Sequence, residues 1–199
     1  MTGHLPRTVP LPELPEPNRW ERSAIARHRP CDSRTRDGVP MTLRRIGPDD
    51  FDLAHRFLSS LSRGTRYFRF GNGRFIYSDD ELRRLCTPAP RTRDHVIAVI
   101  DGEDGPLMVG SARYVVADDG ETGEFALMVL DGWARQSIGR RLMEALEACG
   151  RARGLRAMTG RILGSNLTML AFAARSGYGI DEATRDAQIK TVRKTLGAH

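Results

Sequence analysis

The sequence predicts a mixed α/β domain in which a largely antiparallel sheet is flanked by helices. Three observations support this prediction. Strand-like and helical segments alternate from residue 41 onward. Three successive strand-like segments are joined by the tight turns DGEDG and ADDGETG, which indicates antiparallel neighbours. Two further helices then flank one more strand, so that helices can cover the faces of the sheet. A chain of 199 residues can form one domain with a sizeable core.

The first part of this region reads as a strand followed by two helices. Residues 42–46 (TLRRI) form a short strand-like segment. A helix is predicted from residues 47–50 to about Leu61, because proline suits the first turn of a helix and acidic residues complement its N-terminus. Residues 78–81 (SDDE) form a capping box, which predicts a second short helix that ends near Cys86.

The second part contains the best-defined helix of the chain. Apolar residues recur at helical spacing after Trp133, and Gly154 is suited to end this helix. Asn166 can cap another helix. The remaining predicted elements are strands at 95–100, 106–117, 123–130, 157–163 and 188–196, and a helix at 167–176.

Residues 1–40 differ in composition from the rest of the chain. They contain seven of the eleven prolines and show no hydrophobic period, so they offer too little apolar surface to offset the entropy of ordering. We expect a disordered extension over 1–40 and one domain over 41–199. We see no signal peptide and no segment long enough to span a bilayer. The three cysteines lack CxxC spacing. We therefore expect a cytoplasmic protein with no metal site and no membrane attachment.

The formal net charge of +6 raises the question of nucleic-acid binding. All 31 basic residues except Lys190 and Lys194 are arginine, and such a skew indicates codon composition more than selection for phosphate contacts. The arginines are also spread among acidic residues along the chain, whereas a nucleic-acid interface concentrates them on one face. We expect no nucleic-acid partner.

The segment DGWARQSIGRRLMEAL, residues 131–146, joins a strand to a helix and carries an unusual charge pattern. Helix N-termini favour acidic side chains and bound anions. Here Arg135, Arg140 and Arg141 occur and no acid lies between Gly132 and Met143. Small residues at 137 and 139 would let a phosphate approach the backbone amides.

A structural explanation of the same pattern is also available. Arg140 and Arg141 can pair with Glu144 and Glu147 along the helix surface. This pairing is compatible with anion binding, but it does not account for Arg135 or for the missing acids. The residues themselves leave both interpretations open.

From Thr42 to Tyr178 the chain resembles the GNAT superfamily of acyl-CoA-dependent N-acyltransferases. The resemblance includes, in order, GEFALMVL, WARQSIGRRLMEALEACGRARGL, AMTGRIL and SNLTMLAFAARSGY. The family's phosphate loop, Q/R-x-x-G-x-G/A, falls on residues 134–139. Ala134 and Ser137 depart from this pattern, and Gly139 matches it.

The resemblance implies acetyl-CoA as cosubstrate and a set of residues that bind it. The backbone of Leu127, Met128 and Val129 is expected to pair with the pantetheine arm where two strands splay apart. Asn166 matches an asparagine that contacts CoA, and it suits a plain helix cap equally well. Arg135 or Gln136 can replace the polar side chain lost at Ala134, and Gly139 is expected to be the residue least able to change. The loop residues expected to contact the cofactor are Arg135, Gln136, Ser137, Ile138, Gly139 and Arg140.

The stretch LSRGTRYFRF is similar to one found in bacterial relatives of protein-lysine acetyltransferases. This resemblance implies an amine acceptor, either a protein lysine or a small molecule, built against loops near residues 62–78 and 165–185. A structural interpretation, in which Tyr67, Phe68 and Phe70 are core aromatics, is equally open.

Glu124 is the candidate general base. It shares one face of the strand 123–130 with Ala126, Met128 and Leu130. A carboxylate on an apolar face is expected to be partly desolvated, with a raised pKa. Family relatives have a glutamate base at the matching place. The alternative is a solvated, inert glutamate at the rim of the strand.

The family's usual general acid is absent from this chain. A tyrosine is expected seven residues after Asn166, and Ala173 stands there. Tyr178 matches a packing aromatic of the family. We therefore expect an N-acetyltransferase in which the thiolate departs without that acid, since a thiol pKa lies near 8.5. The alternative is a GNAT-fold protein that senses acyl-CoA without catalysis. The oligomeric state, including a homodimer, stays open.

Overall fold

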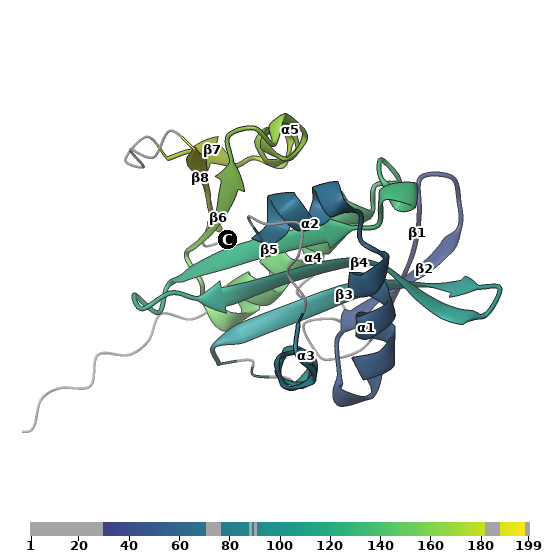
Figure 1. Cartoon of the computed structure of the whole chain (residues 1–199). Helices are drawn as coiled ribbons and strands as arrows, with labels where there is room; N and C mark the ends of the chain where they lie inside the picture. The colour runs from purple at the N-terminus through teal and green to yellow at the C-terminus, as the bar shows by residue number, and fades with distance from the viewer. Residues whose placement is uncertain (1–29, 71–76, 88, 90, 182–187, 198–199) are drawn as a thin grey trace, which may run out of the picture.

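The computed structural model describes residues 30–70, 77–87, 89, 91–181 and 188–197. These residues form one sheet with the strand order β1-β2-β3-β4-β5-β6-β8-β7 and with helices on both faces (Figure 1). Neighbouring strands are antiparallel except for β5 and β6, which are parallel. The predicted fold class is therefore confirmed. The strands are β1 (Cys31–Arg34), β2 (Pro40–Arg45), β3 (Arg93–Gly102), β4 (Gly105–Val116), β5 (Thr122–Val129), β6 (Ala157–Leu163), β7 (Gly179–Ile180) and β8 (Ile189–Thr195). The helices are α1 (Phe51–Ser60), α2 (Arg63–Phe70), α3 (Asp79–Cys86), α4 (Ile138–Arg153) and α5 (Leu167–Arg175), with 3-10 turns η1 (Pro48–Asp50) and η2 (Asp131–Trp133).

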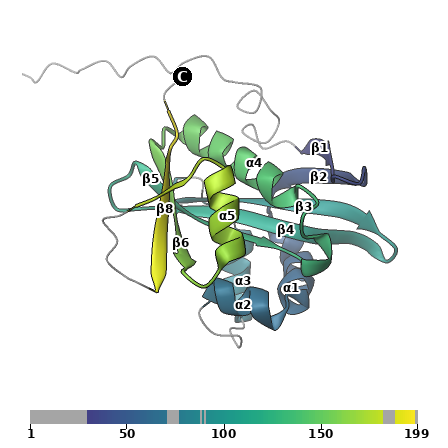
Figure 2. The ribbon, with the colours of Figure 1, turned by 90° about the horizontal axis from the view of Figure 1, so that it is seen from above.

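Two apolar cores lie on opposite faces of the sheet. Helix α4 covers one face of β3, β4 and β5, and helices α1 and α3 cover the other (Figure 2). Leu142 and Leu146 of α4 are fully buried in the first core, and Phe57 of α1 is fully buried in the second. No helix in the described part of the chain is both long enough and apolar enough to cross a membrane.

The predicted helix signals form the expected local contacts. The backbone N–H of Ser78 donates to Glu81 Oε2 at 2.8 Å, and the Glu81 N–H donates to Ser78 Oγ at 3.3 Å, so the capping box is confirmed. Helix α4 ends at Gly154, whose φ of 88° is left-handed as expected of a glycine after a helix. Helix α4 also approaches the sheet closely at Gly110, where a Cβ atom would lie 2.8 Å from Leu142 Cδ1.

Part of the predicted N-terminal extension is ordered, which corrects its expected boundary. Strand β1 (Cys31–Arg34) pairs with β2 through a turn at Asp37-Gly38, and Gly38 has a φ of 89°. The signal was present in the sequence, because Asp-Gly between two short segments is a typical hairpin turn. The prediction of disorder for residues 1–29 lies outside the described residues.

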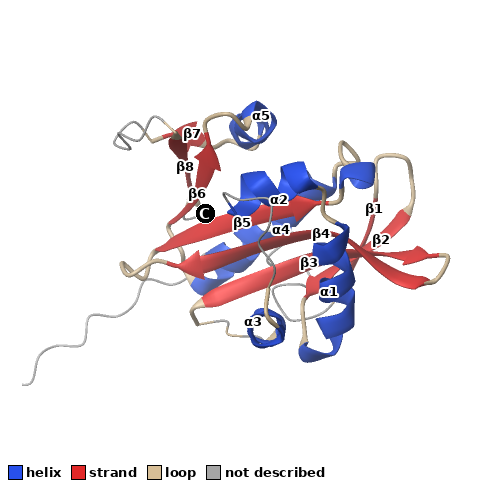
Figure 3. Cartoon of the chain, viewed as in Figure 1, coloured by secondary structure: helices blue, strands red, loops and turns tan. Residues whose placement is uncertain are grey.

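The sheet divides between β5 and β6. These strands pair only from Thr122–Ala157 to Glu124–Thr159, whereas β5 continues to pair with β4 as far as Val129. Beyond the last pair, β6 and β8 diverge steeply from β5, together with α5 (Figure 3). The edge of β5 that faces β6 is therefore open from Phe125 onward.

Candidate active site

A cleft of about 1290 Å³ occupies the division between β5 and β6. The second half of β5 forms one wall, including Leu127, Met128 and Val129. Because β6 has diverged, the backbone N–H and C=O groups on this side of β5 have no strand to pair with. An extended ligand with its own amide groups can satisfy them. The strand splay expected from the sequence is therefore present at these residues.

The turn that leads into α4 has a left-handed backbone at two residues that are not glycine. Arg135 has a φ of 61° and Ser137 a φ of 63°. Residues in such conformations concentrate at ligand-binding sites, and turns of this kind direct successive N–H groups into a concave surface that suits anions. Ser137 thus has a conformation that glycine adopts without strain. Both residues line the cleft.

The first turn of α4 has no acidic residue and a side-chain pair on its surface. Arg140 donates to Glu144 Oε1 at 2.8 Å, as one interpretation of the sequence expected. The pairing expected for Glu147 is wrong. Glu147 is buried and accepts hydrogen bonds from Lys194 Nζ at 2.7 Å and from the Tyr178 hydroxyl at 3.0 Å, so it belongs to the core contact between α4 and β8.

Gln136 is held by the hairpin of β1 and β2. Its amide nitrogen donates to Asp37 Oδ2 at 2.5 Å, and its backbone carbonyl accepts from the Arg36 N–H at 3.0 Å. The side chain is thus bound to the hairpin and does not take the place of the polar residue lost at Ala134, as the sequence suggested it could. Its structural contribution is to fix the turn. Arg36 lines the cleft, a position that sequence reasoning missed when it assigned this segment to a disordered extension.

The atoms of the protein itself leave room for a side chain at Gly139. A Cβ atom there would lie 3.4 Å from Leu127 Cδ2 and 3.5 Å from Phe172 Cε2, which are ordinary contact distances. Its φ is not left-handed. Gly110 is sterically more restricted, since its Cβ would also lie 2.9 Å from Ile138 Cγ2. An alanine at position 139 would therefore not clash with the rest of the protein, and whether it disturbs a bound phosphate stays a prediction to be tested.

Glu124 lies in the cleft but is exposed, which corrects the expected desolvation. It does share its face of β5 with Met128, which is buried in the core beside α1 and α3. That core ends before it reaches Glu124, because Glu124 lies near the opposite end of the strand, opposite the exposed Val115 of β4. The carboxylate therefore faces the open part of the cleft.

Two arginines lie near Glu124 on the same side of the cleft. Arg113 is on β4, opposite Ala126, so it is a diagonal neighbour of Glu124. Arg69 projects from α2, and both arginines line the cleft. Burial and the positive charge of Arg113 lower the pKa of Arg69, while Glu124 acts in the opposite direction. Sequence reasoning missed both arginines. Arg113 is on a strand and Arg69 is on a helix that was not predicted, and the two come together only in the fold.

Helix α2 is positioned by contacts to the loop after β5. Thr65 Oγ1 donates to Asp131 Oδ1 at 3.0 Å, and the Ser62 N–H donates to Asp131 Oδ2 at 3.3 Å. The interpretation of the three aromatics as core residues is wrong for Tyr67 and Phe68, whose exposed fractions are 47% and 39%, whereas Phe70 is partly buried against the core beside α1 and α3. Phe68 instead lines the cleft. Residues 71–76 and 182–187 of the expected acceptor loops lie outside the described residues.

The last helix provides a cap and a packing aromatic. Asn166 Oδ1 accepts a hydrogen bond from the Met169 N–H at 3.1 Å, so Asn166 caps α5, and it also lines the cleft. Ala173 is buried. The Tyr178 ring packs edge-on against Phe125 with centroids 5.0 Å apart. Burial and the adjacent Glu147 raise the Tyr178 pKa far above its usual value, and its hydroxyl donates to Glu147.

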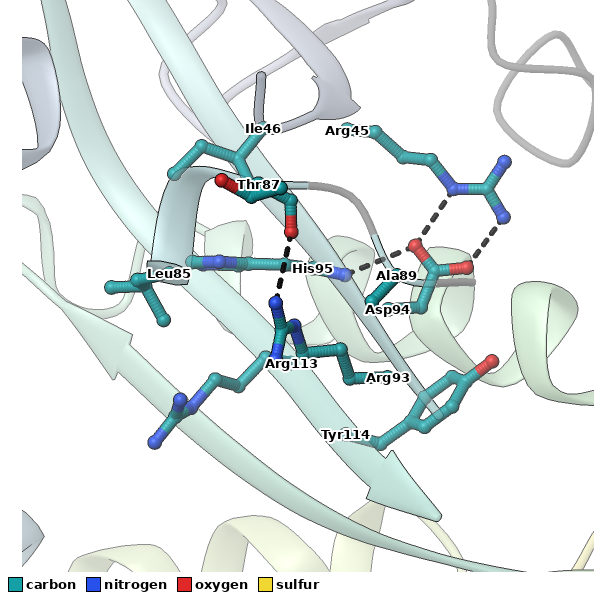
Figure 4. A pocket seen from close by; sticks show the side chains of 10 residues that line it. All are labelled: Arg45, Ile46, Leu85, Thr87, Ala89, Arg93, Asp94, His95, Arg113 and Tyr114. Atoms are coloured by element: carbon teal, nitrogen blue, oxygen red, sulfur yellow. Dashed lines mark hydrogen bonds and ion pairs between the residues drawn. The ribbon is translucent and has the colours of Figure 1, made fainter. Parts of the chain in front are cut away.

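A second, much smaller cavity lies beneath α3, beside His95 (Figure 4). Its volume of about 30 Å³ suits about one water molecule. His95 Nε2 lies 2.6 Å from Ser111 Oγ, and Nδ1 faces the Leu85 backbone without a well-formed hydrogen bond. Burial, reinforced by the charge of Arg113, lowers the pKa of His95 to about 4. Asp94, also on this cavity, is engaged by Arg45 at 2.7 Å and 2.5 Å.

The divided sheet leaves an open strand edge beside a left-handed turn, and both line one cleft. The model of the acetyltransferase (GNAT) family matches residues 60–178. The chain therefore belongs to the GNAT acetyltransferase family, as the sequence resemblance indicated.

Solved structures show the same fold. The GNAT domain of Streptomyces lividans PAT has a TM-score of 0.77 and 21% identity over 90% of this chain and 99% of that one. The yncA protein from Salmonella typhimurium, in a structure with its cofactor acetyl-CoA, has a TM-score of 0.61 and 17% identity over 80% and 95% of the two chains. A cAMP-binding acyltransferase from Mycobacterium smegmatis has a TM-score of 0.57 and 20% identity, and this chain covers 48% of its length.

Proposed function

We propose that the protein transfers an acetyl group from acetyl-CoA to an amine, either a protein lysine or a small molecule. The observation that supports this most is that one cleft brings together the open edge of β5, the left-handed turn before α4 and the exposed Glu124. Family membership agrees with this assignment. The structure of yncA with acetyl-CoA shows that a protein of this fold binds that cosubstrate.

Each part of the cleft has a distinct task in this proposal. The backbone of Leu127 to Val129 binds the amide groups of the pantetheine arm through the unpaired edge of β5. The N–H groups of residues 135–139 and the N-terminus of α4 hold the diphosphate, with Arg135 and Arg140 beside it. Asn166 keeps α5 in place across the cleft through its cap, and it contributes a polar surface there.

The chemistry requires a neutral amine and a proton acceptor. The amine nitrogen attacks the thioester carbonyl carbon, a C–N bond forms, the C–S bond breaks, and the nitrogen proton passes to the Glu124 carboxylate directly or through one water. The exposure of Glu124 to the cleft makes it accessible for this transfer. The CoA thiolate leaves without a tyrosine acid, because Ala173 carries no hydroxyl and the Tyr178 hydroxyl donates to Glu147.

A second candidate function is an acyl-CoA sensor that does not catalyse. The engaged hydroxyl of Tyr178 is the observation that favours it, since the described part of the cleft then contains no tyrosine to protonate a leaving group. The sensor shares every cofactor contact with the enzyme. The two functions differ in whether any amine releases CoA thiol.

Two measurements test these functions. Acetyl-CoA is expected to raise the unfolding temperature saturably, and no shift at millimolar concentration would refute both. Thiol release is then measured across amines and lysine peptides, and Glu124→Gln is expected to lower the rate about a hundredfold. The matched control is Glu103→Gln, in the exposed turn between β3 and β4, which is expected to leave the rate unchanged. Equal rates for Glu124→Gln and wild type would exclude Glu124 as base, and CoA binding without any thiol release would favour the sensor.

A further inference from the structure

The acceptor side of the cleft contains more positive charge than the reaction described above requires. Among the described residues that line the cleft, seven are arginine and two, Glu124 and Asp131, are acidic. The diphosphate accounts for arginines close to the N-terminus of α4. It does not account for Arg69 and Arg113, which lie on the face of β4 and β5 turned toward α2, near Glu124 at the start of β5.

Arg69 is partly buried and forms no ion pair with a carboxylate of the described residues. Its Nε atom is buried and has no hydrogen-bond partner among the described residues. A buried guanidinium donor without an acceptor is costly, and arginine is the side chain best suited to bind a carboxylate through two parallel hydrogen bonds. The Arg69 Cζ atom lies 5.2 Å from the centroid of the Phe70 ring.

The nearby acids do not neutralise the two arginines. Asp131 accepts hydrogen bonds from Thr65 and Ser62 and thereby fixes α2. Asp94, the acid next to His95 on β3, is bound by Arg45, and Figure 4 shows the Arg113 guanidinium turned away from that pair. Among the described residues, Glu124 is then the one carboxylate beside the two guanidinium groups that is not bound elsewhere, so the described part of this region carries an excess positive charge.

The residues around the arginines form a defined surface for a ligand. Phe68 from α2 and Val115 from β4 are apolar, are partly exposed and line the same cleft. Asp131 anchors the start of α2, which contacts β5, and Arg69 lies one helical turn after Thr65. The site thus combines an apolar surface, the Glu124 carboxylate and the guanidinium groups of Arg69 and Arg113.

We propose that Arg69 and Arg113 bind a carboxylate of the acceptor, so that the preferred substrate is an amine with an acidic group a few atoms from its nitrogen. This inference rests on the proposed acetyl transfer. The acceptor carboxylate neutralises the excess charge, and the two guanidinium groups favour the neutral, nucleophilic form of a nearby amine. Glu124 then accepts the proton from that amine. A free amino acid and a lysine next to an acidic residue both supply this chemistry.

Matched pairs of acceptors test the proposal with acetyl-CoA and the full chain. One pair is methionine and methioninamide. The other is a blocked Lys-Asp peptide and its Lys-Asn counterpart. The acidic member of at least one pair is expected to have a kcat/KM about tenfold higher or more, and the pair that shows this preference identifies the source of the carboxylate. Arg69→Gln and Arg113→Gln are expected to reduce the acidic member to the level of the neutral one.

The controls separate a binding role from a structural one. Arg56→Gln, on the exposed surface of α1, makes the same charge change outside the cleft and is expected to retain the preference. Arg113→Lys is expected to retain part of the preference for the acidic member that Arg113→Gln loses. Thermal unfolding identifies any variant that fails to fold. Equal kcat/KM within both pairs, or a preference that persists in both glutamine variants, would overturn the proposal.

A binding measurement distinguishes this inference from the proposed function. The same pairs are titrated calorimetrically into protein saturated with CoA, where no acetyl group can transfer. Arginine-dependent binding of an acidic amine without turnover would leave the carboxylate subsite standing and refute the transferase. Turnover at equal rates for the acidic and neutral members of each pair would support the transferase and refute the carboxylate subsite. Absence of both binding and turnover would refute both.

Discussion

Replacement of Ser137 by glycine tests the conformation on which the cofactor loop depends. A left-handed conformation costs a residue other than glycine about 1–2 kcal/mol, and Ser137 has a φ of 63°. Glycine removes this cost but loses about 0.5–1 kcal/mol through the greater entropy of the unfolded chain. The side chain of Ser137 makes no capping hydrogen bond that would be lost. The net expectation is that Ser137→Gly raises the free energy of unfolding by about 0.5–1 kcal/mol.

Chemical denaturation of the two proteins measures this difference, and thermal unfolding should show a rise of about 1–4 °C. Ser59→Gly is the matched control, because Ser59 is an exposed residue inside α1 where glycine lowers stability. Acetyl-CoA is expected to stabilise Ser137→Gly at least as much as it stabilises wild type. If Ser137→Gly lost as much stability as Ser59→Gly, the left-handed turn, and with it the argument for the anion site, would be refuted.

Three further changes test other parts of the structure. Gly139→Ala is expected to change the free energy of unfolding by less than about 1 kcal/mol and to retain stabilisation by acetyl-CoA. Gly110→Ala is expected to lower that free energy by about 1–3 kcal/mol, because the added methyl group overpacks against α4. Equal losses in denaturant titrations would contradict the distances given for the two glycines. In the folded protein His95 has a pKa of about 4, against 6.5 for the ordinary side chain. Between these two pH values the unfolded chain binds a proton at His95 that the folded protein does not bind. The free energy of unfolding therefore falls as the pH decreases from about 6.5 to 4. The loss contributed by His95 is at most about 3 kcal/mol, and denaturation curves of His95→Gln across this range should lack it. Tyr178→Phe is expected to cost about 1–2 kcal/mol through the lost hydrogen bond to Glu147 while kcat is unchanged, and a large fall in kcat would mean that Tyr178 takes part in proton transfer.

Local signals in the sequence predicted most of the fold. The capping box at Ser78, the glycine stop at Gly154 and the apolar period of α4 act within a few residues of each other, so they can be read without the rest of the chain. The hairpin at Asp37 was missed because the surrounding prolines and charges were taken as a sign of disorder. Helix α2 was not predicted as a separate helix, because it is short and none of its residues is buried.

The site was less predictable, because its properties arise between distant segments. The binding of Gln136 by Asp37 joins residues 99 positions apart. The exposure of Glu124 depends on where β6 leaves β5, which no alternation within β5 reveals. Glu147 was assigned to the surface of α4 because its partner, Lys194, follows 47 residues later on β8.

The open edge of β5 means that the free protein lacks main-chain hydrogen bonds that a pantetheine arm would supply. The part of the sheet containing β6, β8 and β7 joins the larger part through three β5–β6 residue pairs, ending at Glu124–Thr159. A ligand lying along Leu127 to Val129 would take the place of the absent neighbour strand and bridge the gap between the two parts. The amide groups of such a ligand would hydrogen-bond to an edge of β5 that the polypeptide leaves unpaired beyond Glu124.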